Sequence, residues 1–217
     1  MKEFVCIAAL LTALAAAGSA SAEALAGSAS IDQIGGHVAT VSQSGDHNTA
    51  LIDQRGGRDA MASIVQQGAG NDTEIRQSGL GAQVAATGQY GDENCILVSQ
   101  ATGGNGIEVM QNGNGNYAQA NQTGGSIQVV LQAGSSNQSY TEQQGAGNHA
   151  TLTQMGNNNL ATQGQYGAGN TQTVTQMGNN NTLDYEQIGS NLADLKILQK
   201  GGMSMSITQT PGLTKYN

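Results

Sequence analysis

Residues 143–164 read as two successive units of eleven residues, QQGAGNHATLT (143–153) and QMGNNNLATQG (154–164). Each unit opens with Gln, has Gly two residues later and Asn five residues later, and has Ala seven residues after the Gln. A unit of this length accommodates one short strand and one tight turn. The stretch therefore predicts a β-structure built by repetition.

The same period runs through most of the chain. Seventeen glutamines span 176 residues in sixteen steps, a mean of 11.0. Gly stands two residues after nearly every one, and at Gln100 it comes one residue late. A register kept over this length indicates an array of one structural unit. The glutamines are Gln33, Gln43, Gln54, Gln66, Gln77, Gln89, Gln100, Gln111, Gln122, Gln132, Gln143, Gln154, Gln165, Gln176, Gln187, Gln199 and Gln209.

Asparagine marks a second position of the unit. In ten units it follows the Gln by five residues, and these residues are Asn48, Asn71, Asn94, Asn105, Asn116, Asn137, Asn148, Asn159, Asn170 and Asn181. Gly and Asn tolerate positive φ, so the segment between strands is expected to be a tight turn.

Alternation within a unit predicts which side chains point inward. In residues 148–154, Asn, Ala, Leu and Gln occupy the even-numbered positions, and His, Thr and Thr occupy the odd-numbered positions. On a strand these two sets face opposite sides. Residues 48–54 and 191–199 divide in the same way, and the small residues expected to point inward are Ala50, Ala118, Ala150, Ala161 and Ala193.

Two units make a rung of strand, turn, strand and turn. The predicted fold is all-β, a cross-β solenoid of about eight two-stranded rungs with about 22 residues per rung. An eleven-residue period also suits a right-handed helical coil. The recurrent glycines exclude it, because they would break each such helix.

Inward Gln and Asn need partners, because an unpaired buried amide costs several kcal/mol. In a solenoid the next rung places the same amide directly above, so identical side chains can bond along the axis as in cross-β structures. The Gln and Asn series is therefore the predicted assembly ladder. A rung without a cap exposes unpaired strand edges, which we expect to be the site of self-assembly.

The chain divides into three expected parts. Residues 1–22 have a basic start, an apolar run and an Ala-Ser-Ala end typical of a signal peptide. Residues 23–209 form the solenoid and residues 210–217 a C-terminal tail.

The net charge of −8 argues against nucleic acid as a partner. Cys95 is the only cysteine beyond the expected signal peptide, which excludes an internal disulfide there.

The pattern Gln-x-Gly-x-x-Asn-x-Ala-x-aliphatic-x-Gln resembles the curlin-associated repeat of curli amyloid subunits. It is clearest in residues 43–54, 143–154 and 154–165. The resemblance implies a secreted subunit that passes an outer-membrane pore with accessory factors and folds at the cell surface. It also implies polymerisation with itself and with a homologous curlin subunit into fibres (a pilus or fimbrium) that support adhesion and biofilm.

The chain departs from the familiar curlin subunits in having about eight rungs where they have about five, and in carrying Asn where they often have Ser. Its end, with Lys196, Lys200 and Lys215, is similar to the basic final repeat of the minor subunit that nucleates fibres. The nucleating and the major subunit both remain open, because terminal repeats often drift from the consensus.

No catalytic, metal or cofactor site is expected. His37, His47 and His149 lie in separate units, and the acidic pairs Asp72 with Glu74 and Asp184 with Glu186 are best explained as solvated outer positions. A monomeric solenoid that binds ice or carbohydrate is the alternative, for which residues 171–175 supply a short Thr ladder. A β-helix enzyme acting on polysaccharide would need a cleft, which these short turns do not provide.

Overall fold

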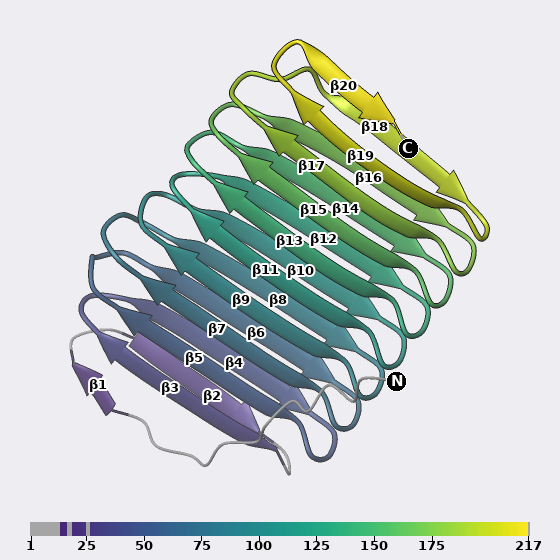
Figure 1. Cartoon of the computed structure of the whole chain (residues 1–217). Coiled ribbons are helices and arrows are strands. Elements are labelled where there is room, and N and C mark those ends of the chain that lie inside the picture. The colour runs from purple at the N-terminus through teal and green to yellow at the C-terminus, as the bar shows by residue number, and fades with distance from the viewer. Residues whose placement is uncertain (1–13, 17–18, 25–26, 217) are drawn as a thin grey trace.

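The computed structural model describes the backbone of residues 14–16, 19–24 and 27–216 and the side chains of residues 27–212. The chain winds as a flat coil whose strands alternate between two stacked sheets, here sheet A and sheet B (Figure 1). The described part contains no helix, and therefore none long and apolar enough to cross a membrane.

Sheet A contains β1 (Leu14–Ala16), β3 (Ser28–Ile34), β5 (Thr49–Arg55), β7 (Asp72–Ser78), β9 (Cys95–Ala101), β11 (Tyr117–Thr123), β13 (Gln138–Gln144), β15 (Leu160–Tyr166), β17 (Thr182–Ile188), β19 (Ser204–Thr210) and β20 (Leu213–Tyr216). Sheet B contains β2 (Ser19–Ala24), β4 (Val38–Ser44), β6 (Met61–Gln67), β8 (Val84–Tyr90), β10 (Gly106–Asn112), β12 (Ile127–Ala133), β14 (His149–Met155), β16 (Thr171–Met177) and β18 (Leu195–Lys200).

The seventeen strands from β3 to β19 are parallel to their neighbours, and each pairs with the strand one rung away. The register places like residues over one another, as with Gln54 and Gln77 or Gln154 and Gln176. The predicted β-solenoid is thus confirmed. Because seventeen strands alternate between two sheets, the first and the last, β3 and β19, both lie in sheet A.

The core is a thin layer between the sheets, filled by the inward residues of both. Ile52, Ile75 and Leu152 are fully buried, and the alanines predicted to point inward are buried as well, with one exception. Ala193 is exposed, because β18 begins only at Leu195 and not at residue 191 as predicted. The step from one repeat Gln to the next is twelve residues here, and the longer turn takes up the extra length.

The two ends of the coil differ. At the start, β1 and β2 pair with β3 and β4. Most of the expected signal peptide, residues 1–13 and 17–18, lies outside the described residues, and its removal would bare the edges of β3 and β4. At the other end the expected tail folds back, and β20 pairs antiparallel with β19 after a turn at Pro211 and Gly212.

Cys95 is disulfide-bonded in the structure of the whole chain. The sequence predicts no internal disulfide for residues 23–217, where Cys95 is the only cysteine. That prediction does not apply to the chain before residues 1–22 are removed.

The turns stack as closely as the strands. Gly145 has a φ of 105°, and a Cβ on it would lie 2.0 Å from the carbonyl oxygen of Gly167 in the turn above. Gly125 does not have a positive φ, and a Cβ added to it would have no heavy atom within 4 Å beyond those of its own residue and its two chain neighbours. The recurrent glycine two residues after Gln is therefore required by both backbone conformation and rung spacing.

We expect Gly145→Ala to lower the free energy of unfolding by at least about 2 kcal/mol, because it adds a strained φ to a clash with backbone. Gly125→Ala is the matched control and should change stability by less than about 0.5 kcal/mol. Denaturant titration of both variants measures the difference. Equal stabilities would show that the turns do not stack as described.

Candidate assembly site: the amide ladders and the ends of the coil

All seventeen predicted glutamines are buried, with no more than 5% of any side chain exposed. They form two ladders, one per sheet, in which each side-chain amide bonds to the next glutamine along the axis at 2.6–3.4 Å. Nine glutamines from Gln33 to Gln209 make the sheet A ladder and eight from Gln43 to Gln199 make the sheet B ladder.

Most of the ladder glutamines also tie the two sheets together. Gln154 donates from Nε2 to Oε1 of Gln176 at 2.8 Å and to the backbone carbonyl of Gln138, in the facing sheet, at 2.9 Å. Gln66 does the same with Gln89 and the carbonyl of Thr49. A single amide therefore satisfies both of its N–H groups, one along the axis and one across the core.

Two buried glutamines off the ladders provide an internal comparison. Gln128 has Ile107 and Ala150 as its neighbours in register, and Gln163 has Thr141 and Tyr185. Neither the nitrogen nor the oxygen of their side-chain amides has a hydrogen-bond partner in the described residues. Gln83 and Gln172, the other buried glutamines off the ladders, donate to backbone carbonyls, but their Oε1 atoms have no partner in the described residues. In this core both the nitrogen and the oxygen of a glutamine amide are satisfied only where the neighbouring rungs repeat it.

Seven of the ten predicted asparagines form one continuous ladder at the corner leading into sheet A. In this ladder Asn94 donates its backbone N–H to Oδ1 of Asn71 at 3.1 Å, and its Nδ2 to the same oxygen at 3.0 Å and to the carbonyl of Gly113 at 2.7 Å. The members are Asn48, Asn71, Asn94, Asn116, Asn137, Asn159 and Asn181.

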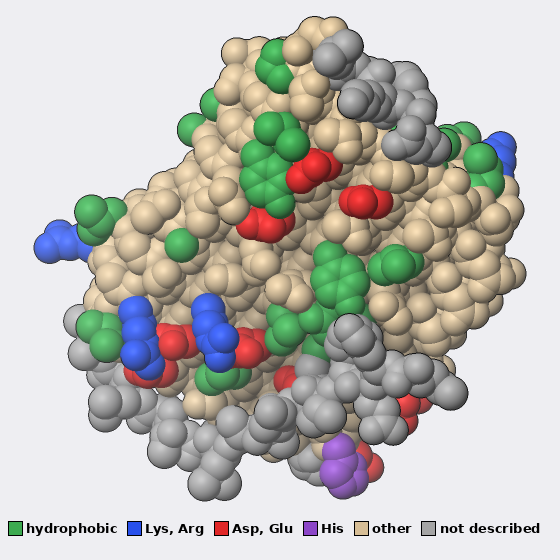
Figure 2. All heavy atoms as spheres, viewed as in Figure 1, with side chains coloured by type: hydrophobic (Ala, Val, Ile, Leu, Met, Phe, Trp, Pro, Cys, Tyr) green, Lys and Arg blue, Asp and Glu red, His purple; other side chains and the backbone are tan. Residues whose placement is uncertain are grey.

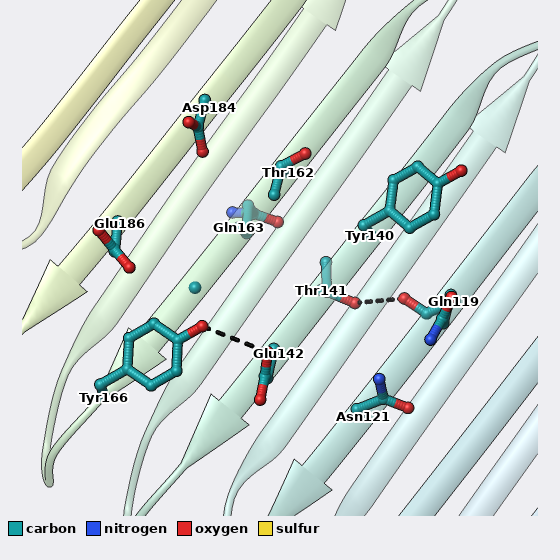
Figure 3. Close-up of a pocket in the computed structure, with 11 residues that line it drawn as sticks. Gln119, Asn121, Tyr140, Thr141, Glu142, Thr162, Gln163, Tyr166, Asp184 and Glu186 are labelled. Atoms are coloured by element: carbon teal, nitrogen blue, oxygen red, sulfur yellow. Dashed lines mark hydrogen bonds between the residues drawn. The ribbon is translucent and has the colours of Figure 1, made fainter.

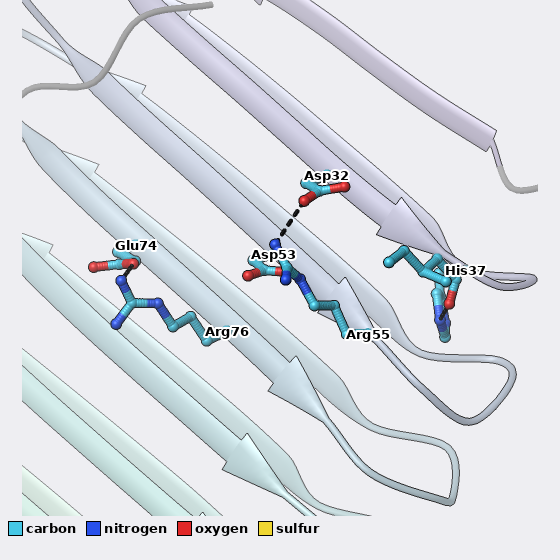
Figure 4. A network of polar contacts seen from close by, with 7 residues as sticks. Asp32, His37, Asp53, Arg55, Glu74 and Arg76 are labelled. Atoms are coloured by element: carbon cyan, nitrogen blue, oxygen red, sulfur yellow. Dashed lines mark hydrogen bonds and ion pairs between the residues drawn. The ribbon is translucent and has the colours of Figure 1, made fainter. Parts of the chain in front are cut away.

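The other three, Asn105, Asn148 and Asn170, lie at the opposite corner, where the series is interrupted. Ser126 stands between two of them. His37 takes the equivalent place at the first rung: it is buried, its Nδ1 accepts the N–H of Ala60 at 3.3 Å, and its Nε2 lies 3.1 Å from the carbonyl of Ile34 (Figure 4). His37 thus substitutes for a corner asparagine, a role that its isolated place in the sequence did not indicate.

The glutamine ladders have a direction. Every Nε2 donates toward the C-terminal end, so the Oε1 atoms of the first glutamines, Gln33 and Gln43, are buried without a partner in the described residues. At the opposite end Gln209 donates to the carbonyl of Ala193 at 3.0 Å and has no further glutamine above it. One end of the coil thus presents two amide acceptors. At the other end Gln199 donates to the carbonyls of Thr182 and Met203, and Gln209 has one N–H that the described residues do not pair.

The outer face of sheet A carries most of the charge on the strands (Figure 2). Arg55 bonds to Asp32 at 2.7 Å and to Asp53 at 2.6 Å, and Arg76 pairs with Glu74 (Figure 4). These ion pairs are largely exposed and contribute little to stability. They neutralise part of an acidic face.

A hollow on the same face lies beside Gly164, which stands in register between Glu142 and Glu186 (Figure 3). The ring of Tyr166 lies over the missing side chain, and its hydroxyl donates to Glu142 at 3.2 Å. Burial, followed by the charge of Glu142, raises the pKa of Tyr166. The hollow is an open depression in a flat sheet, and it does not form a cleft.

The side chains of residues 27–212 form no larger threonine array that would support the ice- or carbohydrate-binding alternative. The Thr ladder covers two neighbouring strands, with Thr151 beside Thr173 and Thr153 beside Thr175, and gives way to Lys196 and Leu198 in β18. Among the described residues, no three His, Cys, Asp or Glu side chains lie close enough to hold a metal ion.

Asp72 is the carboxylate most affected by its surroundings. It is partly buried at the start of β7, and burial, followed by the neighbouring charge of Glu74, raises its pKa to about 6. Its ionised form therefore disfavours the folded state at neutral pH.

The described residues define a class of protein, the parallel β-solenoid with buried amide ladders. The family model of the curlin associated repeat matches residues 38–68, which contain β4, β5 and β6, and residues 148–178, which contain β14, β15 and β16. These two segments support the resemblance of the repeat to that of the curlin family. Comparison with curated proteins and with solved structures found no match.

We expect stability to rise as the pH falls from 7.5 to 5, because the folded state binds a proton at Asp72 below about pH 6 while the unfolded chain binds it near 3.8. Asp72→Asn should remove this part of the pH dependence. It should also stabilise the protein at pH 7.5 by on the order of 1 kcal/mol, a value reduced for solvent screening.

Denaturation midpoints of wild type and Asp72→Asn at both pH values measure the effect. Asp46→Asn, in an exposed turn, is the control for loss of one negative charge. The explanation is wrong if Asp72→Asn and Asp46→Asn shift the midpoints equally at both pH values.

Proposed function

We propose that this protein is a subunit of an extracellular curli-type amyloid fibre that grows by end-to-end stacking of its coils. The observation that carries the proposal is the direction of the glutamine ladders, which leaves acceptors at one end and, at the other, one N–H of Gln209 that the described residues do not pair. A buried acceptor without a partner costs about 1–3 kcal/mol. A second copy can satisfy it with the same bond that the coil uses internally.

The junction is best formed in sheet A. Both terminal strands, β3 and β19, belong to that sheet, so stacking puts β3 of one copy on β19 of another and Gln33 over Gln209. Sheet B contributes one strand fewer per copy, from β4 to β18, and has an open strand position at each junction. The bonds between copies therefore depend mainly on the sheet A ladder.

Two terminal segments must move or be removed before copies can stack. Removal of the expected signal peptide, residues 1–22, bares β3 and β4. At the other end β20 occupies the edge of β19 that the next copy needs. β20 has only four residues and runs antiparallel, so a parallel strand with an aligned glutamine can replace it.

The family supports the wider setting of this function. Curlin subunits are structural fibre proteins, which favours a structural role over an enzymatic one. Secretion through an outer-membrane pore with accessory factors, adhesion, and a place in the biofilm matrix are proposed on the same ground. The nucleating role is proposed beside that of the bulk subunit, since Lys196 and Lys200 lie near the C-terminal end. Seeding a homologous subunit with this protein separates the two roles.

Assembly of residues 23–217 should give thioflavin-positive fibres with a lag phase. Gln33→Leu removes the acceptor that faces the next copy in sheet A, and we expect it to lengthen the lag several-fold. Gln43→Leu is the matched control in sheet B: it breaks an equivalent internal bond, 2.7 Å to Gln66, but faces the open strand position. Thioflavin kinetics and electron microscopy of both variants measure the effect.

Stacking in sheet A is refuted if the two variants are delayed equally while wild type forms fibres. A mature chain that stays soluble and monomeric at high concentration, with or without seeds, would falsify the fibre function itself.

Deleting residues 211–217 removes β20 and frees the edge of β19. We expect this truncated chain to assemble with a shorter lag and to elongate faster from existing fibres, because no strand has to be displaced. A chain with the same seven residues replaced by a Gly-Ser sequence controls for length. The role of β20 as a cap is excluded if deletion leaves both rates unchanged.

A further inference from the structure

The outer faces of the two sheets differ in charge. On sheet A the strands from β3 to β19 carry seven acidic residues and two arginines at outward positions. On sheet B, Glu108 is the only outward residue from β4 to β16 with a formal charge, His149 being counted as neutral, and the last strand, β18, adds Lys196 and Lys200. One face of the coil is acidic, and the other is nearly uncharged.

The uncharged face is also the apolar one. Fifteen large apolar side chains are exposed in the described residues, and eleven of them lie on sheet B. They stand in rows across the strands. Val65, Met110 and Leu131 lie in one row, which Gly88 interrupts, and Met61, Val84 and Ile127 lie in another, which Gly106 interrupts. A concentration of apolar surface on one side marks an interaction surface.

The size of this face suits a stable contact. The seven strands from β4 to β16, about 4.8 Å apart and each of about seven residues rising about 3.3 Å, cover roughly 780 Å². A typical specific interface buries about 800 Å² on each partner. The rows have gaps at Gly88 and Gly106, into which apolar side chains of a second sheet of the same kind can fit.

We propose that sheet B binds sheet B of a second copy, so that fibres pair face to face through it. Two acidic A faces would repel one another, and an A face on a B face would desolvate unpaired carboxylates. The B–B contact buries one carboxylate per copy, that of Glu108. This inference rests on the proposed fibre, in which stacking extends the apolar rows and multiplies a weak contact along the length.

The test compares double variants of matched chemistry on the two faces. Val65→Lys with Leu131→Lys places charges on sheet B, and Leu51→Lys with Leu97→Lys places the same charges at outward positions of sheet A. Wild type and the sheet A variant should form paired filaments. The sheet B variant should form single filaments of half the mass per length at an unchanged elongation rate. Glu108→Gln should increase pairing.

A second measurement does not depend on any variant assembling normally. Met61 and Met110 are half exposed in the single chain, and pairing should slow their oxidation by peroxide several-fold in wild-type fibres relative to the folded single chain. Peptide mass spectrometry reads each methionine separately.

Single wild-type filaments, pairing that survives the sheet B substitutions, or unprotected Met61 and Met110 would each overturn the proposal. Single wild-type filaments would still be consistent with end-to-end stacking. If the wild type formed no fibres at all, the proposed fibre function itself would be refuted.

Discussion

The buried glutamine amide is the interaction on which the rest of this structure depends. It can be satisfied inside a thin core because the next rung carries the same group at hydrogen-bond distance, as between Gln154 and Gln176 at 2.8 Å. Gln128 and Gln163 have no such neighbour, and their buried amides have no partner in the described residues. The repeat thus turns a group that is costly to bury into one that fixes register, since a slip of one residue would unpair a whole ladder.

The same requirement cannot be met at the ends of a finite coil. Whatever the number of rungs, the first amide of each ladder has an acceptor with no glutamine beneath it, and the last amide has no glutamine above it. Ordinary solenoids cover such ends with capping repeats. Here the N-terminal cover, β1 and most of β2, falls within the expected signal peptide, and the C-terminal cover is the four-residue β20. Both covers are short compared with the edges they protect.

Most of the fold could be predicted from the sequence because one register, fixed by Gln, Gly and Asn, recurs in every rung. The positions that escaped prediction are those where the repeat is broken. Ala193 is exposed because an added residue lengthens its turn, and Tyr185 is fully buried at a sheet A position that the other strands fill with smaller side chains, such as Ile207, or with Gln163. The return of β20 could not be predicted either, since no other unit contains such a strand. Of the candidate site, the inward side chains were predictable. The asparagines separate into a continuous and a broken ladder, and this could be recognised only once the structure showed that each strand pairs with the strand two repeat units away.

The ends of the coil and the outer face of sheet B differ in how strictly they select a partner. At an end, backbone edges and a glutamine must meet in one register, so the contact is directional and favours a chain with the same period. The outer face of sheet B carries rows of Val, Met, Ile and Leu, whose contacts depend on area and shape more than on register. Placing most of the charge on the strands of sheet A keeps these two contacts separate, because it leaves the apolar face from β4 to β16 as the one long surface on which copies do not repel each other. A chain with charge spread over both faces would retain its ends and lose the lateral contact, so charge placement controls pairing while the amide ladders control growth.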